Sequence, residues 1–104
     1  MKSLLIDRSM TDLAAGAAEA AGVLKALANE NRLMILCKLL ERGEMSVMPL
    51  AEAVDLSQSA LSQHLAKMRE EKIVAFRREG LTVFYRVADS NVVKILKTLK
   101  AIYC

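Results

Sequence analysis

Neutral hydrogen-bonding side chains follow Ser57 on a segment with helical periodicity. Ser57 is a favourable N-cap, and it predicts a helix from Gln58 to about Glu71. Leu61, Leu65 and Met68 recur at helical spacing, which indicates that one face packs inward. The opposite face offers amide and hydroxyl groups, which can hydrogen-bond to base edges in a DNA major groove. Its residues are Gln58, Ser59, Ser62, Gln63 and Lys67.

His64, the only histidine, lies two turns into the same predicted helix. A lone imidazole is a poor zinc site, and no neighbouring nucleophile or acid gives it a catalytic partner. We therefore expect His64 to contact a phosphate or a base, or to make a hydrogen bond on the helix surface. No Ser/His/Asp arrangement is present, and the four glycines form no phosphate-binding pattern. The sequence predicts no enzyme activity and no cofactor.

The two cysteines, Cys37 and Cys104, have a different chemistry, because thiolates can be oxidised to a bridge. Cys37 follows Leu36 in an apolar run, so a small buried core residue is one interpretation. Cytosolic disulfides are also uncommon unless they are regulatory. Cys104 ends the chain as given, where packing gives little reason for a thiol. From the residues alone, both a structural and a reactive role stay open.

The predicted helix from Gln58 to about Glu71, called the reading helix below, would be held by a preceding helix and a following hairpin. A short helix over residues 46–54 and a three-residue turn, Asp55 to Ser57, predict a helix-turn-helix at about 46–71. Two β-prone runs, 73–78 and 82–87, flank Gly80, which allows the positive φ of a tight connection. They predict a small wing at about 73–87 that carries Arg77, Arg78 and Arg86.

Positive charge is concentrated in this part of the chain. Between Ser57 and Arg86, six basic residues accompany three acidic ones, whereas the rest of the chain holds nine of each. The whole formal net charge of +3 therefore lies where the reading helix and the wing are expected. A polyanionic partner such as DNA is favoured by this distribution.

Three further helices are predicted around this unit, at about 11–27, 29–42 and 89–103. The helix at 29–42 ends at Gly43 as a C-terminal stop, and Asp89 caps the last one. The first and last helices carry apolar stripes, which from the pattern alone fit either a core or a dimer interface. The stripes consist of Leu13, Ala17, Ala20, Ala21, Leu24 and Leu27 in the first helix, and Val92, Ile95, Leu96, Leu99, Ile102 and Tyr103 in the last.

Length and composition predict a single domain over residues 1–104, mainly α with a small β-hairpin. Hydrophobic residues make up 54% and aromatic residues 4%, so aliphatic side chains and methionine must build the core. The N-terminal residues lack the long apolar stretch of a signal peptide, and no run approaches the roughly 20 apolar residues of a membrane helix. We expect a cytoplasmic protein with no membrane association.

Three motifs in this order resemble the ArsR/SmtB-type winged-helix regulators from about Ala20 onward. They are residues 28–36, residues 56–65, and the wing segments 76–80 and 83–86. The resemblance implies a homodimeric winged helix-turn-helix with the first and last helices at the interface. Such a dimer would present two reading helices about 34 Å apart to an inverted-repeat operator in double-stranded DNA. Contacts near bases or adjoining phosphates would come from Gln58, Ser59, Ser62, Gln63 and His64, and backbone contacts from Lys67, Arg77 and Arg78.

The metal-sensing branches of this family place paired cysteines at the start of the helix-turn-helix, or Asp and His along the last helix. Here Ser46 and Met48 occupy the first position, and the last helix has Asp89 but no histidine. The residues therefore predict no metal site.

The pair Cys37 and Cys104 resembles instead the sulfide- and persulfide-responsive SqrR/BigR branch, to which HlyU- and NolR-type regulators are related. That resemblance implies a repressor of sulfide-detoxification or redox-related genes. It would be released when a reactive sulfur species or an oxidant converts both cysteines into a disulfide or polysulfide bridge. One alternative is an HlyU/NolR-like constitutive regulator, architectural protein or antirepressor without a thiol switch. Another is a protein-interaction module that does not bind DNA.

Overall fold

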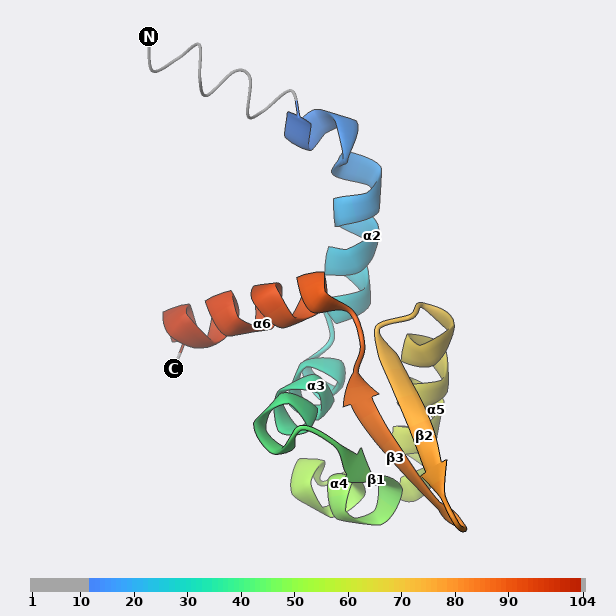
Figure 1. Ribbon diagram of the computed structural model, residues 1–104. Helices are drawn as coiled ribbons and strands as arrows, with labels where there is room; N and C mark the ends of the chain where they lie inside the picture. Colours follow the sequence, from blue (N-terminus) through green and yellow to red (C-terminus); the bar gives the residue numbers. More distant parts are fainter. Residues whose placement is uncertain (1–11, 104) are drawn as a thin grey trace, which may run out of the picture.

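The chain folds into helices around one small antiparallel sheet (Figure 1). The structure, a computed structural model, describes residues 12–103. Thr11, the expected start of the first helix, lies outside the described residues, as does Cys104, one of the two predicted redox-sensing cysteines. The elements are α2 (Ala17–Leu27), α3 (Glu30–Arg42), β1 (Met45–Ser46), α4 (Val47–Val54), α5 (Gln58–Glu70), β2 (Val74–Glu79), β3 (Thr82–Val87) and α6 (Ser90–Tyr103).

The sheet has the order β1-β3-β2, with β3 in the middle. Tyr85 of β3 lies opposite Met45 of β1 on one side and Phe76 of β2 on the other. Gly80 has φ +62° in the two-residue connection of the β2–β3 hairpin, as its sequence position predicts. The predicted fold class, mainly α with a small β-hairpin in a winged helix-turn-helix, is confirmed.

Several predicted element boundaries differ from the structure, and two of the differences have a clear physical reason. The first helix is not continuous over 11–27, because residues 12–15 end in a turn at Gly16 and α2 begins at Ala17. The N–H of Gly16 is shared between the carbonyls of Leu13 (3.0 Å) and Asp12 (3.3 Å), as happens where a helical turn stops. The helix expected from Ser46 begins at Val47, because Ser46 pairs with Phe84 in the unpredicted strand β1.

The core is a single cluster of aliphatic and methionine side chains. α3 packs on α4 and β3, and α4 packs on α5. Leu36 of α3, Leu61 of α5 and Val92 of α6 are fully buried, so the core joins these three helices. The largest fully buried side chains are Ile35, Leu36, Leu39, Leu50, Leu61, Leu65, Met68, Val74 and Val92.

Helices α2 and α6 leave much of their apolar stripes uncovered. Leu24 is 57% exposed, Ile102 65% and Tyr103 79%, whereas Leu27, Val92 and Leu96 are buried. Figure 1 shows α2 and α6 away from the tip of the β2–β3 hairpin and the α4–α5 turn. Within residues 12–103, no helix is long and apolar enough to cross a membrane.

Candidate nucleic-acid interface

Local backbone geometry sets the angle between α4 and α5. Asp55 adopts the left-handed conformation (φ +55°, ψ +49°), which ends α4 and turns the chain. The N–H of Leu56 then donates to the carbonyl of Ala51 at 3.0 Å and closes this end of the helix. The Oγ of Ser57 accepts from the N–H of Ala60 at 3.1 Å and starts α5, as predicted from its side chain.

The inward face of α5 is as the periodicity indicates. Leu61, Leu65 and Met68 have no exposed surface. The opposite face is exposed along its length, and the five residues predicted to lie on it do so: Gln58, Ser59, Ser62, Gln63 and Lys67. The exposed face of α5 thus offers neutral hydrogen-bond donors and acceptors in its first two turns and a cation in the third, opposite the buried face.

His64 differs from these residues because its side chain is half-buried. Burial lowers the pKa of His64, and the positive charge of Arg32 lowers it further. A neutral imidazole can donate one hydrogen bond and accept another but brings no charge to a phosphate. The geometry therefore favours a hydrogen-bonding role over an ionic one at this position.

The far end of α5 is closed by a Schellman motif. Lys72 adopts φ +62°, its N–H donates to Arg69, and the N–H of Ile73 donates to Met68 at 2.9 Å. Ile73 is buried directly before β2 and does not belong to the strand. This turn sends the chain straight from the reading helix into the wing, so the hairpin emerges beside α5.

The two neighbouring wing arginines lie on opposite faces of the sheet, because side chains alternate along a strand. The guanidinium of Arg77 donates through Nη2 and Nε to both carboxylate oxygens of Glu44, at 2.6 and 3.0 Å. Its Nη1 donates to Glu79 at 2.8 Å, and the guanidinium carbon of Arg77 lies 4.6 Å from the ring centre of Phe84. These two hydrogen-bonded carboxylates raise the pKa of Arg77, so the charge is permanent but already paired.

Arg78 points to the other face, where Phe76 and Tyr85 pack with ring centres 5.6 Å apart. Arg69 from α5 lies 4.8 Å above the Phe76 ring, and Arg78 lies 5.8 Å from it. Within the described part of the chain, Arg78 forms no ion pair with a carboxylate, and its side chain is exposed. Arg78 is thus available to a phosphate in a way that Arg77 is not.

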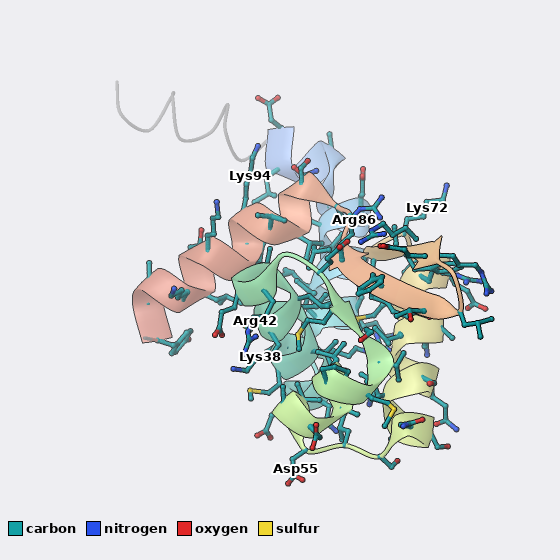
Figure 2. The ribbon with its side chains drawn as sticks, turned by 60° about the horizontal axis from the view of Figure 1, so that its bottom comes forward. Lys38, Arg42, Asp55, Lys72, Arg86 and Lys94 are labelled. Atoms are coloured by element: carbon teal, nitrogen blue, oxygen red, sulfur yellow. The ribbon has the colours of Figure 1, made fainter. Side chains whose placement is uncertain are left out.

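Other basic side chains lie around this region without converging on one point. Figure 2 shows Arg86 and Lys72 toward the wing, whereas Lys38 and Arg42 lie on α3. The acidic Asp55 lies at the α4–α5 turn. Arg86 is exposed on β3 opposite Ala75. The hydrogen bond from Arg77 lowers the pKa of Glu44, and the charge of Arg86 lowers it further.

Arg32 and Glu44 have structural contacts that the sequence did not reveal. Arg32 is largely buried, donates to the carbonyl of Ala26 at the end of α2 (3.0 Å), and lies 3.5 Å from Glu71 at the end of α5. Arg32 therefore joins α2 to α5. Glu44 is 33 residues away from Arg77 in the chain, and no local pattern indicates their contact.

Cys37 is exposed on α3. The interpretation of Cys37 as a small core residue is therefore wrong for the single protomer, because the buried face of α3 is formed by Ile35, Leu36 and Leu39. Across residues 12–103, no three His, Cys, Asp or Glu side chains come together as metal ligands would.

Comparison with known proteins agrees with this geometry. Residues 29–75 match the family described as bacterial regulatory protein, arsR family. The transcriptional activator HlyU of Vibrio cholerae is 44% identical over 92% of this chain and 88% of its own. The crystal structure of HlyU from Vibrio vulnificus superposes with a TM-score of 0.83 at 44% identity, covering 92% of this chain and 99% of that one. The transcriptional repressor BigR from Xylella fastidiosa gives 0.86 at 37% identity, covering 91% and 96%.

The helix-turn-helix, the adjoining wing and the length of these matches lead to one assignment. The chain belongs to the ArsR family and is a DNA-binding transcriptional regulator, not an enzyme.

Proposed function

We propose that this chain works as a homodimeric repressor of sulfide-detoxification or redox-related genes. It leaves its operator when Cys37 and Cys104 are joined by a disulfide or polysulfide bridge. The observation that carries the proposal is the exposure of Cys37 on a helix that packs directly against α4. The similarity to BigR, a transcriptional repressor, agrees with this sign of regulation.

The uncovered apolar side chains of α2 and α6 support a dimer. Leu24 of α2 and Ile102 and Tyr103 of α6 are each more than half exposed, as is Leu13 in the helical turn before α2, although a monomer gains nothing by leaving them in water. A two-fold axis through these helices would leave both reading helices free for an inverted repeat, about one DNA turn apart. Arg32, which links the end of α2 to the end of α5, would carry changes at the interface to the reading helix.

On the DNA, the exposed face of α5 would enter the major groove. Gln58, Ser59, Ser62 and Gln63 would contact base edges or adjoining phosphates, with His64 as a neutral hydrogen-bonding group at the margin. Lys67 and Arg78 would lie along the phosphate backbone, whereas Arg77 is already paired with Glu44 and Glu79. Glutamine can bond bidentately to adenine, so the two glutamines are the strongest candidates for sequence recognition.

The thiol step needs only an external sulfane sulfur. One cysteine thiolate attacks the outer sulfur of an organic persulfide, which releases a thiol and leaves a cysteine persulfide. The second thiolate attacks the inner sulfur of that group, expels hydrosulfide and completes a disulfide. The sulfane sulfur is reduced by two electrons as the two cysteines are oxidised. A bridge that retains additional sulfur would be a polysulfide, and an oxidant acting through a sulfenic acid would give the plain disulfide.

A second candidate is a constitutive regulator or antirepressor without a thiol switch. The relative from Vibrio cholerae is described as a transcriptional activator, which favours this alternative. In that case the cysteines would have no effect on affinity for DNA.

The test is fluorescence anisotropy of the dimer on DNA from its own upstream region, first reduced, then treated with an organic persulfide, then returned to dithiothreitol. We expect a large, reversible loss of affinity in the native chain. Cys37→Ser should bind like the reduced chain and ignore the persulfide. Intact-mass analysis of the same samples counts the sulfur atoms in the bridge. Tight binding that treatment leaves unchanged would contradict the thiol switch and favour the constitutive regulator.

A further inference from the structure

The carboxylate clamp on Arg77 connects two strands that are not neighbours. β1 and β2 lie at opposite edges of the sheet, with β3 between them. Glu44 directly precedes β1, and its carboxylate reaches across β3 to the guanidinium on β2. Phe84 of β3 lies beneath this bridge, with its ring centre 4.6 Å from the guanidinium carbon. Glu79, further along β2, accepts a hydrogen bond from the remaining guanidinium nitrogen, Nη1, at 2.8 Å.

The position of this clamp bears on the geometry of DNA reading. β1 leads without a linker into α4, the first helix of the helix-turn-helix. β2 and β3 form the wing. The backbone pairing of β1 with β3 ties α4 to the middle strand only, and β2, which carries Arg77 and Arg78, is not paired with β1. The Glu44–Arg77 pair joins these two bodies through two parallel hydrogen bonds, and such a bidentate pair has a defined orientation.

We propose that Arg77 is a positioning residue rather than a phosphate contact, and that the Glu44–Arg77 clamp holds the wing at the angle at which Arg78 meets the DNA backbone. The proposal rests on the DNA-binding role of the chain. Its consequence is unusual in sign, because it makes an acidic residue beside a polyanion favourable for binding.

Glu44→Gln separates this role from simple electrostatics. If Glu44 acted only through its charge, its removal would tighten binding to DNA. The clamp predicts the reverse, because glutamine replaces one of the two acceptor oxygens by an NH2 donor, which cannot accept from the guanidinium. An exposed ion pair contributes little free energy, and the variant loses one such pair in each of the two protomers. The loss corresponds to roughly two- to thirtyfold weaker binding. Glu52→Gln, which removes an exposed carboxylate from α4 outside the clamp, is the matched control and should bind equally well or slightly better.

Salt dependence separates a positioning residue from a phosphate contact. Each phosphate neutralised contributes about 0.9 to the slope of log K against log salt concentration. Arg78→Ala should therefore reduce the slope by about 1.8 for a symmetric dimer. Arg77→Ala should weaken binding and leave the slope unchanged. Arg77→Lys keeps the charge but loses the bidentate geometry, so it should also weaken binding.

The two clamp residues should also be coupled. In an Arg77→Ala background, Glu44→Gln should cause no further loss of affinity, because the clamp is already broken. Circular dichroism melts of every variant check that the fold is retained, and Arg77→Lys serves if Arg77→Ala is unstable.

Each result has a separate meaning. Weaker binding by Glu44→Gln with an unchanged slope for Arg77→Ala is the expected outcome. Tighter binding by Glu44→Gln, or a slope reduced by Arg77→Ala as much as by Arg78→Ala, would overturn the clamp while leaving DNA binding intact. A native chain without salt-dependent binding would instead contradict the DNA-binding role itself.

Discussion

Gln63→Ala tests whether α5 reads bases. Gln63 is exposed, so truncation removes no core contact and should change the free energy of unfolding by less than about 0.5 kcal/mol. A bidentate glutamine–adenine pair contributes roughly 1–3 kcal/mol of discrimination, and a symmetric dimer makes it twice. The loss of affinity for the cognate operator should therefore be about 2–6 kcal/mol, or at least roughly thirtyfold.

The structure also limits where in the operator this loss appears. Gln58 and Gln63 are five residues apart on α5, about 7.5 Å along the helix axis. At roughly 3.4 Å per base pair, the two glutamines span about two base pairs in each half-site. Gln63→Ala should thus lose preference at one or two symmetric positions and keep it elsewhere.

Competition anisotropy with operators substituted one base pair at a time measures this directly. Lys67→Ala is the matched control, because Lys67 lies one turn further along the same exposed face. It should weaken binding to every operator equally and reduce the salt slope. Equal weakening of all operators by Gln63→Ala, or a reduced salt slope in that variant, would refute base reading by this residue.

The other predictions concern stability, pH and assembly. Ser57→Ala removes the N-cap of α5 and should lower the free energy of unfolding by about 1 kcal/mol, seen in urea titrations. Lys72→Gly removes the backbone strain of a non-glycine residue at positive φ, so it should raise the free energy of unfolding by up to about 1 kcal/mol and raise the melting temperature. A lower melting temperature would contradict this. Because burial and Arg32 lower the pKa of His64, the folded state takes up this proton less readily than the unfolded chain. The contribution of His64 is therefore present above about pH 6.5 and lost as the pH falls through its folded pKa, and His64→Gln should flatten this dependence in melts at several pH values. If α2 and α6 form the proposed dimer interface, the native chain should sediment as a dimer and Ile102→Glu as a monomer, while the helical circular dichroism is retained.

Periodicity and capping residues predicted the helices near the reading unit well. The helix expected from Gln58 to about Glu71 runs from Gln58 to Glu70, because the Ser57 cap and the buried leucines are local signals. Asn29 accepts from the N–H of Arg32 and starts α3 in the same way. The sequence does not predict the break at Gly16, because a single glycine inside an alanine-rich run is compatible with a helix.

The parts that could not be predicted depend on contacts between distant residues. β1 has only two residues, too few for an alternating pattern, and it exists because Met45 and Ser46 pair with β3. Arg77 and Arg78 look equivalent in the sequence, and only the register across the sheet separates the clamped one from the available one. The half-burial of His64 likewise depends on neighbouring elements rather than on its place in α5.

Hydroxyl-radical footprinting of the reduced chain on its own upstream DNA tests the central claim most directly. A winged-helix dimer reading with α5 predicts two symmetric protected regions about one helical turn apart, with wing protection at their outer flanks and loss of both after persulfide treatment. One isolated protected region, or none, would contradict the proposed dimeric reading of an inverted repeat. Two regions that persist after persulfide treatment would keep the DNA-binding geometry and contradict the thiol switch.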